Sequence, residues 1–454
     1  MSPRRYTGLW RRGAVYQYRV RVPCDVITLV GKSRINRSLG TASFSEAIRL
    51  ARKIAYEMQT HFDGLRGQEG GAETPELTPA REVLCLPPPL KLGKTVEQVV
   101  DLYLGDPTSS RTAKSTTTYR TTYATIMAIV GPGTPMASLN RESCRDILGV
   151  LQHLPSNSRK KWPGADPREV ATMAREKGVP PMSPANVNEY LNKLSTLFNW
   201  AIKEEIVSRN PAKGLKLGDA INARDKRRPF APWQLRKIFD APIYRGCRDD
   251  GAGYAMNGPA KPRRSRFWIP LIGLFAGMRL NEICQAHSTD VREVEGVWCF
   301  VVSAAGAEGK RLKTTASERI VPVHPTLRKI GLLEYAAERR RRGDLRLFPE
   351  LQPDAFGLYS GRFSKWFARF LTSCAATADR TCYHSFRHCF RDALREAGVE
   401  REIALTIGGW ASSGFAAGAV ADRYGQGFSP ANLQRAIAKI SFPGLNLEHL
   451  FQES

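Results

Sequence analysis

The sequence lacks the features that mark secreted, metal-binding or membrane-spanning proteins. Its nine cysteines include no Cys-x-x-Cys pair, which excludes a zinc ribbon or a dithiol redox motif of the usual spacing. Apolar residues never run together for the roughly 18 positions that suggest a membrane helix, and the opening residues MSPRRYTGLWRRG lack the apolar core of a signal peptide. We therefore expect a soluble protein of the reducing cytoplasm, with no membrane partner.

Acidic residues are also scarce relative to basic ones. The 454-residue chain holds 43 Asp and Glu against 68 Lys and Arg, which gives a formal net charge of +25. A surplus of this size attracts polyanions, so nucleic acid is the favoured partner. The alternative is a basic protein whose cations are only solvated. The length predicts roughly two to four domains.

The first part of the chain has the pattern of a small basic sheet followed by a helix. Residues 9–41 alternate apolar and basic side chains, with Arg12 and Arg19 among the basic ones, and this is the period of β-strands. Residues 43–65 carry apolar side chains at helical spacing. Because a Gly- and Pro-rich stretch follows, we predict a β-rich region at 1–65 and a linker at 66–93.

The middle of the chain is predicted to be all-helical over residues 94–216, with helices near 95–104, 115–129, 140–151 and 184–204. Segment 156–183 interrupts this pattern, and we interpret it as a surface insertion. In the last helix the apolar residues form one stripe, and Asn188 and Lys193 fall off it. We expect these two side chains to be free to face a ligand.

A second linker, 217–228, is basic and contains Arg227 and Arg228. Helices and short strands mix in the region that follows, 229–440, and a tail occupies 441–454. The last helical pattern, near residues 433–440, fits either a closing helix of the same core or a segment that docks on a neighbouring protomer. The fold class expected for the whole chain is multidomain, mainly α with small β-sheets.

An arginine stands at the end of the most apolar segment of this last region. The apolar run 269–275 reads as core, and Arg279 and Glu282 follow it at helical spacing. A guanidinium at the margin of a buried helix needs an anionic partner or several acceptors. The partner is either a ligand or Glu282 itself, and the sequence leaves both open.

Two strands are predicted next, at 298–302 and 319–323, joined by a hairpin rich in Gly and Lys. We expect this hairpin to carry Lys310 and Lys313 outward. A lone lysine in a loop is nearly always solvated. On a hairpin tip it is also well placed to reach into a cleft and deliver a proton.

The segment YHSFRH opens a helix with one apolar and one cationic side. The cationic side carries His384, Arg387, His388, Arg391 and Arg395. Two His four residues apart can chelate zinc, but the metalloprotease motif has Glu after the first His, where this chain has Ser385. We therefore predict no metal site. An anion site that includes His384 and Arg387 is the better interpretation, because both side chains donate hydrogen bonds to phosphate oxygens.

The segment after that helix holds Trp410, in GGW, and Tyr424, in RYG. Tyr424 alone is best interpreted as an ordinary amphipathic aromatic residue. With the residues above they complete a set of two arginines, a lysine, a histidine, an indole donor and a phenol. Such a set could hold a phosphodiester and attack it.

In these residues and their order the chain resembles the tyrosine recombinases, also called phage-type integrases. The family signature is Arg, Lys, His-x-x-Arg, His or Trp, and Tyr, and the matching residues are Arg279, Lys313, His384, Arg387, Trp410 and Tyr424. The match covers residues 229–440. Residues 94–216 resemble the helical core-binding domain of the family, and residues 1–65 resemble its arm-type DNA-binding region. The interval from Trp410 to Tyr424 looks longer than the family's usual one.

The resemblance implies a metal-free and cofactor-free cleavage of DNA in which Tyr424 forms a 3′-phosphotyrosyl bond. Arg279 and Arg387 would stabilise charge on the phosphate, and Lys313 would protonate the leaving 5′-oxygen. His384 would donate a hydrogen bond or carry a proton. Trp410 would buttress the phosphate, and Glu282 would orient the site.

The resemblance also implies the partners: double-stranded attachment sites, a homotetramer assembled on DNA, and accessory proteins that bend DNA. We expect an enzyme associated with the nucleoid, and DNA contacts from Arg12, Arg19, Lys193, Arg227 and Arg228. Two alternatives share some of these features. One is a type IB topoisomerase, and the other is a DNA-binding regulator without catalysis.

Overall fold

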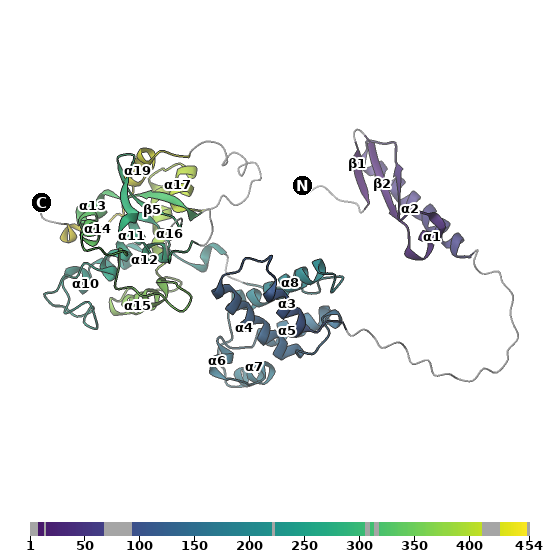
Figure 1. Ribbon diagram of the computed structural model, residues 1–454, viewed down its shortest axis with the longest axis horizontal. Coiled ribbons are helices and arrows are strands. Elements are labelled where there is room, and N and C mark those ends of the chain that lie inside the picture. Colours follow the sequence, from purple (N-terminus) through teal and green to yellow (C-terminus); the bar gives the residue numbers. More distant parts are fainter. Residues whose placement is uncertain are drawn as a thin grey trace. The chain divides into compact units, whose positions relative to one another are not determined.

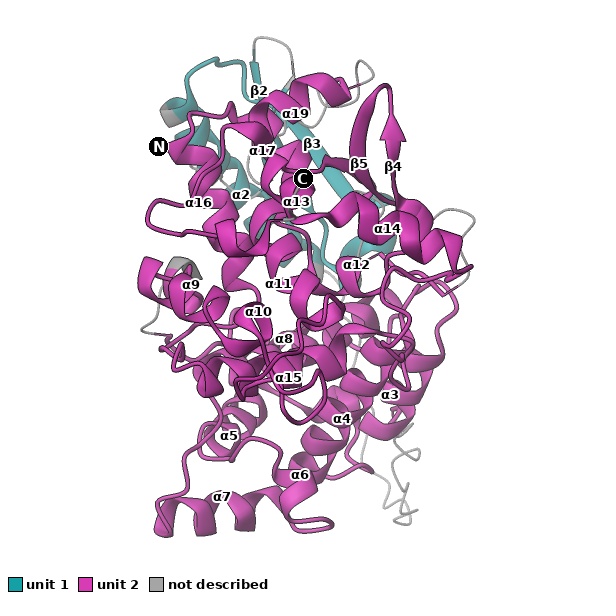
Figure 2. Ribbon diagram, turned by 90° about the vertical axis from the view of Figure 1, so that its left-hand side faces the viewer, with its two compact units in different colours: residues 1–90 teal, residues 91–454 magenta. Residues whose placement is uncertain are grey.

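The computed structural model describes residues 8–12, 15–67, 93–219, 223–304, 309–312, 317–410 and 427–451. The chain divides into two compact units, residues 1–90 and 91–454 (Figure 2). Each unit has its own hydrophobic core among these residues, and the second has two separate buried clusters, one formed by residues 96–215 and the other by residues 230–450. The predicted fold class, mainly α with small β-sheets, is confirmed.

The first unit is a three-stranded antiparallel sheet with a long helix packed on it (Figure 1). The strands are β1 (Leu9–Arg12), β2 (Val15–Arg21) and β3 (Arg34–Ser38), and the helix is α2 (Phe44–Gly67). A short 3₁₀ turn and α1 (Ile27–Val30) join β2 to β3. Both the basic strands and the helix were predicted from their periodicity.

The helical region of the second unit contains α3 (Val96–Gly105), α4 (Ala113–Val130), α5 (Arg141–Leu151), α6 (Ser158–Lys161), α7 (Pro167–Glu176) and α8 (Pro184–Lys203). The four predicted helices are present within a few residues of their expected ends. Local capping sets where they begin: Thr95 Oγ1 accepts from the Gln98 N–H at 3.3 Å, and Ser183 Oγ accepts from the Asn186 N–H at 3.3 Å.

The prediction that residues 156–183 are a surface insertion is wrong. Helix α7 packs on α4 and α5, and its Val170 and Ala174 are buried in the helical core. Arg168 anchors it, because its guanidinium donates to the Asp146 carboxylate and to the Ile129 carbonyl. The apolar face of α7 is only a few residues long and is interrupted by charged residues, so its period was too short to stand out.

The last region holds a second antiparallel sheet, in the order β4 (Val291–Val294), β5 (Val297–Val302), β6 (Arg319–Pro322). Strand β4 was not predicted. The helices of this region are α9 (Pro232–Phe239), α10 (Pro242–Arg245), α11 (Ser265–Ala276), α12 (Leu280–Cys284), α13 (Pro325–Ile330), α14 (Leu332–Arg341), α15 (Ser360–Ser373), α16 (Ser385–Glu396), α17 (Arg401–Gly408) and α19 (Pro430–Ala438).

Helix α11 is the centre of this core. From Phe267 to Ala276 it is apolar on every side, and it packs on α12, α13 and α16, as a helix segment without a polar face must (Figure 1). It ends at Gly277, whose φ is +60°, and a Cβ there would lie 2.2 Å from Cδ1 of Phe390. A glycine is therefore required both for the turn and for the approach of α16. This turn places Arg279 at the start of α12.

The end of the chain packs on its own core. Helix α19 contacts β5 and β6. Its Leu433 and Ile437 are buried in the same cluster as Leu447 and Leu450 of the following segment. Of the two readings left open for this segment, the closing helix is the one observed in the single chain. Among the described residues, no helix combines the length and apolar character that crossing a membrane needs.

Candidate functional site

Two arginines that are far apart in the sequence meet at the end of helix α17. Arg387, in the first turn of α16, is 5% exposed and donates from Nη1 to the Gly277 carbonyl at 2.5 Å and from Nη2 to the Gly408 carbonyl at 2.6 Å. Arg279 is the residue that precedes α12, and its Nη2 donates to the Gly409 carbonyl at 3.0 Å. The two predicted arginines thus share one support.

A third arginine completes that support. Arg319 of β6 donates from Nε to the Ile407 carbonyl at 2.9 Å, so the carbonyls of residues 407, 408 and 409 accept from Arg319, Arg387 and Arg279 in turn. The last carbonyls of a helix have no partner inside it and carry a partial negative charge. The end of α17 is therefore an acceptor platform that fixes three guanidinium groups.

Glycines make the platform possible. Gly409 has a φ of +57°, and a Cβ there would lie 3.1 Å from Cδ of Arg319. A Cβ on Gly408 would overlap the Trp410 ring, at 1.8 Å from its nearest atom. The GGW sequence therefore lets three carbonyls turn toward the arginines while the indole folds back over them.

Glu282 is the carboxylate that these arginines share. Its Oε1 accepts from Arg279 Nη1 at 2.7 Å, and its Oε2 accepts from Arg319 Nη2 at 2.8 Å and from the Arg279 N–H at 2.9 Å. Burial raises the pKa of Glu282, but the two guanidinium groups outweigh it, and the net pKa is lowered. Glu282 is therefore ionised and holds Arg279 in place.

The ion pair with Glu282 does not use all the hydrogen-bond donors of Arg279. Its Nη1 also donates to Ser317 Oγ at 3.3 Å, while Nε–H and one N–H of Nη2 have no hydrogen-bond partner in the described part of the chain. In Arg387, Nε–H and one N–H on each terminal nitrogen also have no acceptor among the residues that the structure describes. The two readings of Arg279 are thus compatible, because the pair leaves donors for an anion.

The cluster carries more positive than negative charge. Burial, together with the nearby guanidinium groups of Arg279 and Arg319, lowers the pKa of Arg387 to about 9. Trp410 lies between two cations, with the guanidinium carbon of Arg387 4.4 Å from its ring centroid and that of Arg391 4.6 Å away. Nη1 of Arg391 is buried without a partner among the described residues. An added anion would relieve this imbalance.

His384 stands at the start of α16, in the same charge field. Burial, then the charges of Arg227 and Arg387, lower its pKa to about 4. The imidazole is therefore neutral at pH 7, with one nitrogen able to donate and the other able to accept. Its ring centroid lies 6.0 Å from that of His388. Within the described ranges, no group of three or more His, Cys, Asp or Glu side chains could hold a metal ion.

The lysines and the tyrosine give a mixed result. Lys310 was expected to point outward with its hairpin, and this is wrong: its side chain is 5% exposed, and Nζ lies 2.6 Å from Oδ1 of Asp290. Asp290 was overlooked as a partner because it lies 20 residues away, before the strands. Lys313 and Tyr424 lie outside the described residues, so their roles stay predictions.

Of the five residues predicted to contact DNA, Lys193 is misplaced. Its side chain is buried, with Nζ 3.3 Å from Thr122 Oγ1 and 5.5 Å from the ring centroid of Tyr119. The buried face of α8 is wider than its apolar stripe, so a long side chain beside the stripe is covered. Asn188 is also used internally, since its amide exchanges hydrogen bonds with the backbone of Leu217.

The other four predicted DNA contacts are not buried where the structure describes their side chains. Arg19 is exposed on β2, donates to Asn36 Oδ1 at 3.1 Å and lies over the Trp10 ring at 4.8 Å. Arg12 ends β1. Arg227 and Arg228 are exposed, and Arg227 is near enough to His384 to affect its pKa.

Arg319 is the residue of this site that the sequence interpretation missed. The alternation of side chains along a strand could have identified it. In β6, Arg319 lies on the same face as the buried Val321, two residues later. A charged residue on the buried face of a strand indicates a buried partner. Its partner, Glu282, lies 37 residues earlier in the chain.

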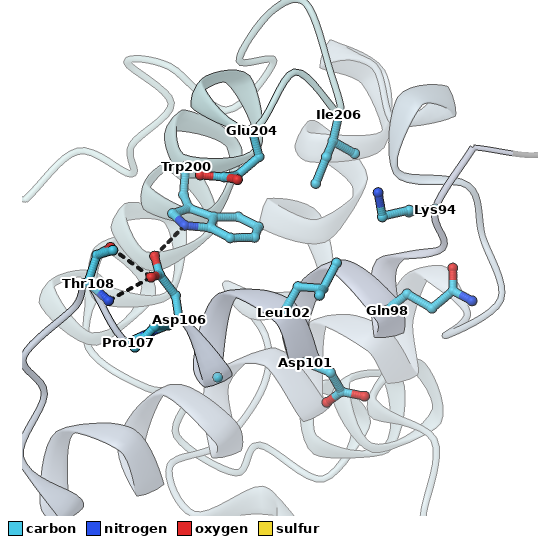
Figure 3. A pocket seen from close by; sticks show the side chains of 11 residues that line it. Lys94, Gln98, Asp101, Leu102, Asp106, Pro107, Thr108, Trp200, Glu204 and Ile206 are labelled. Atoms are coloured by element: carbon cyan, nitrogen blue, oxygen red, sulfur yellow. Dashed lines mark hydrogen bonds between the residues drawn. The ribbon is translucent and has the colours of Figure 1, made fainter.

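A cavity of about 1090 Å³ lies in the helical region, at the ends of α3 and α8 (Figure 3). Its lining includes three carboxylates, Asp101, Asp106 and Glu204, and one cation, Lys94. Asp106 Oδ2 accepts from Trp200 Nε1 at 2.8 Å, and hydrogen bonds from Thr108 lower the pKa of Asp106. An ionised acidic lining does not fit a phosphate, so the arginine cluster is the candidate anion site.

Comparison with known proteins gives one family and several structures. Residues 8–67 match a family described as "Domain of unknown function (DUF6538)". A structure of the Tn1549 transposon integrase in complex with a circular intermediate DNA is 16% identical, with 72% of this chain and 98% of that chain covered and a TM-score of 0.47. A lambda integrase tetramer bound to a Holliday junction is 15% identical, with 90% and 96% covered and a TM-score of 0.47.

A lambda integrase dimer bound to a COC′ core site is similar too, at 16% identity, with 74% of this chain and 98% of that chain covered and a TM-score of 0.46. No curated protein sequence matches. These three structures are of integrases. At this level of likeness, activity has to be argued from the side chains of the site.

Proposed function

We propose that the chain is a tyrosine site-specific recombinase that cleaves and rejoins DNA through a 3′-phosphotyrosyl intermediate. One observation supports this most strongly. Arg279 and Arg387 are fixed side by side on the carbonyls at the end of α17, and each has donors that no other described residue accepts from. Preorganised donors of this kind stabilise the charge that develops on a phosphate during nucleophilic attack.

In the proposed reaction, Tyr424 Oη attacks phosphorus and the bond from phosphorus to the 5′-oxygen breaks. Lys313 gives its proton to that oxygen, and the phenol proton passes to His384, whose neutral imidazole can accept it at pH 7. Arg279 and Arg387 each contribute about 3–4 kcal/mol, by analogy with a single oxyanion-hole donor. Rejoining is the reverse, with a 5′-hydroxyl of the partner strand attacking the phosphotyrosine.

The supporting roles follow from the contacts of the site. Glu282 orients Arg279 through a short ion pair, and Trp410 covers Arg387, where its indole N–H can donate to a phosphate. Because the phosphotyrosine stores the energy of the broken bond, the reaction needs no nucleotide cofactor. The surplus of cations supports a DNA substrate held mainly through phosphate contacts.

We also propose a role for each region of the chain. Residues 1–65 form an arm-type DNA-binding region that includes Arg12 and Arg19, residues 94–216 a core-binding domain, and residues 229–440 the catalytic domain. Residues 66–93 and the basic segment 217–228, with Arg227 and Arg228, link them. Four protomers assemble on double-stranded attachment sites at the nucleoid, helped by DNA-bending proteins, to integrate or excise a mobile element.

The test is a covalent adduct. The protein is mixed, in EDTA, with nicked duplexes built from the junctions between the element that carries its gene and the flanking DNA, and the products are separated on a denaturing gel. We expect an adduct that disappears in Tyr424→Phe. A DNA-binding regulator would bind these duplexes without forming it. Joined strands from two duplexes indicate a recombinase, whereas relaxation of a single supercoiled circle indicates a topoisomerase.

A further inference from the structure

Residues 309–312, which lead directly to Lys313, are tied to the body of the protein by a side chain. Gln285 Nε2 donates to the Arg311 carbonyl at 3.0 Å, and the Arg311 N–H donates to Gln285 Oε1 at 3.1 Å. This two-way exchange is what one strand residue gives its neighbour in an antiparallel sheet. The amide of Gln285 therefore takes the place of a strand, and Gln285 is 3% exposed.

The Gln285 amide is itself held. Asn281 Nδ2 donates to Gln285 Oε1 at 2.8 Å, and the oxygen of the same Asn281 amide accepts from the backbone N–H groups of Tyr359 and Ser360. Arg346 Nη1 donates to the Gln285 carbonyl at 2.7 Å. The side chain that replaces the strand has its orientation set on both sides and cannot swing freely.

The ion pair of Lys310 ties the same segment a second time. Its ammonium lies 2.6 Å from Oδ1 of Asp290, and the other oxygen of that carboxylate accepts from the His287 N–H at 2.7 Å. Both side chains are largely buried. A buried ammonium without its carboxylate is unstable, so the pair holds the chain at residue 310.

Both anchors come from the segment that begins with Arg279. Arg279 precedes the first residue of α12, and Gln285 follows its last residue. One short helix therefore carries the phosphate-binding arginine at one end and the anchor of the lysine-bearing segment at the other. Lysine has a flexible four-carbon stem, so the place where its ammonium can act depends on where its backbone is held.

We propose that Gln285 is a positioning residue. Together with the Lys310–Asp290 pair it fixes residues 309–312 relative to Arg279, and so supports the delivery of a proton by Lys313 to the 5′-oxygen. The inference rests on the proposed function, in which Lys313 is the general acid. Gln285 and Lys310 touch neither substrate nor reacting atoms in this account. Their effect is confined to the leaving-group step.

The test separates leaving-group protonation from every other step. In a duplex whose 5′-bridging oxygen is replaced by sulfur, the leaving group is a thiolate, and because a thiol has a pKa of only about 8.5 it leaves without a general acid. We expect Gln285→Leu to slow adduct formation at saturating DNA by about tenfold to a hundredfold on the oxygen substrate, within the contribution of a general acid. On the sulfur substrate we expect the wild-type rate, with DNA affinity unchanged on both.

Arg311→Met is the matched control. It removes a cation from the same segment, whose guanidinium donates to the Phe356 carbonyl, and leaves both backbone bonds to Gln285 in place. We expect this control to cleave both substrates at the wild-type rate. If Gln285→Leu does not fold, the double variant Asp290→Asn/Lys310→Met replaces it, with the same expectation of rescue by sulfur.

Three outcomes overturn the inference. A loss of rate that is equal on the oxygen and sulfur substrates would mean that Gln285 acts only on general stability. No loss of rate would mean that Lys313 does not need the anchor. The third outcome concerns Lys313→Ala. If this variant cleaves the sulfur substrate no faster than the oxygen substrate, Lys313 is not the general acid and the proposed function is itself wrong on this point. Rescue of Lys313→Ala without rescue of Gln285→Leu rejects the positioning role alone.

Discussion

Removing the guanidinium of Arg319 tests the buried network that supports Arg279 and Arg387, the two arginines proposed to bind phosphate. Arg319→Met would leave Oε2 of Glu282 without its side-chain partner at 2.8 Å and the Ile407 carbonyl without its donor at 2.9 Å. The Arg319 and Glu282 side chains are 4% and 5% exposed, so water does not replace the lost contact. Breaking a buried pair by removing one partner costs about 3–5 kcal/mol.

The assay is equilibrium unfolding in denaturant at pH 7. We expect Arg319→Met to lower the free energy of unfolding by about 3–5 kcal/mol. Arg395→Met is the matched control, since its pair with Asp392 is 2.9 Å long but 65% and 49% exposed, and exposed pairs contribute about 0–1 kcal/mol.

The same network gives the sign of the pH dependence. Because the folded state lowers the pKa of Glu282, its ion pairs add stability above the ordinary pKa of 4.5, and this stability is lost as the pH falls through the lower folded value. We expect the difference between wild type and Arg319→Met to shrink in that acid range. A loss for Arg319→Met no larger than that of Arg395→Met would refute the buried network as the support of the site.

Three further predictions concern single residues. Since the folded pKa of His384 is about 4, its imidazole stays neutral from pH 5.5 to 8. We therefore expect the rate of adduct formation at saturating DNA to show no inflection from His384 over that range. An inflection near pH 6.5 that His384→Gln removes would contradict this. Gly409→Ala should cost about 1–3 kcal/mol of unfolding free energy, because its φ of +57° is strained for alanine and its Cβ would press on Arg319; equal unfolding curves would argue against the platform. Lys193→Met should change thermal stability but not the dependence of DNA affinity on salt concentration, since a buried lysine releases no counterions. A weaker salt dependence in this variant would mean that Lys193 does contact DNA.

Periodicity predicted the elements whose apolar pattern is long. Helix α8 keeps one stripe over twenty residues, and α11 is apolar from Phe267 to Ala276, so both were predicted. Helix α7 has ten residues and a narrow apolar face between charges, and strand β4 has four residues, so neither pattern could be told from a loop. Length and contrast, rather than propensity, decided which elements could be predicted.

The site was predictable only in its residue types. The order of Arg279, His384, Arg387 and Trp410 carried a family resemblance, and the structure brings these residues into one cluster. What holds them could not be predicted, because the supporting carbonyl of Gly409 lies 130 residues from Arg279 and backbone acceptors leave no sequence signal. Lys310 was misjudged for the same reason, since a distant Asp290 decides its burial.

The most direct test of the proposed activity is to identify the atom that carries the DNA. Protein trapped on a nicked attachment-site duplex would be digested with protease and nuclease, and the peptide bearing a nucleotide would be sequenced by mass spectrometry. We predict a nucleotide linked through its 3′-phosphate to Tyr424. Attachment to another residue would refute the assignment of the nucleophile, and binding of the duplex with no linked peptide would refute covalent catalysis by this chain.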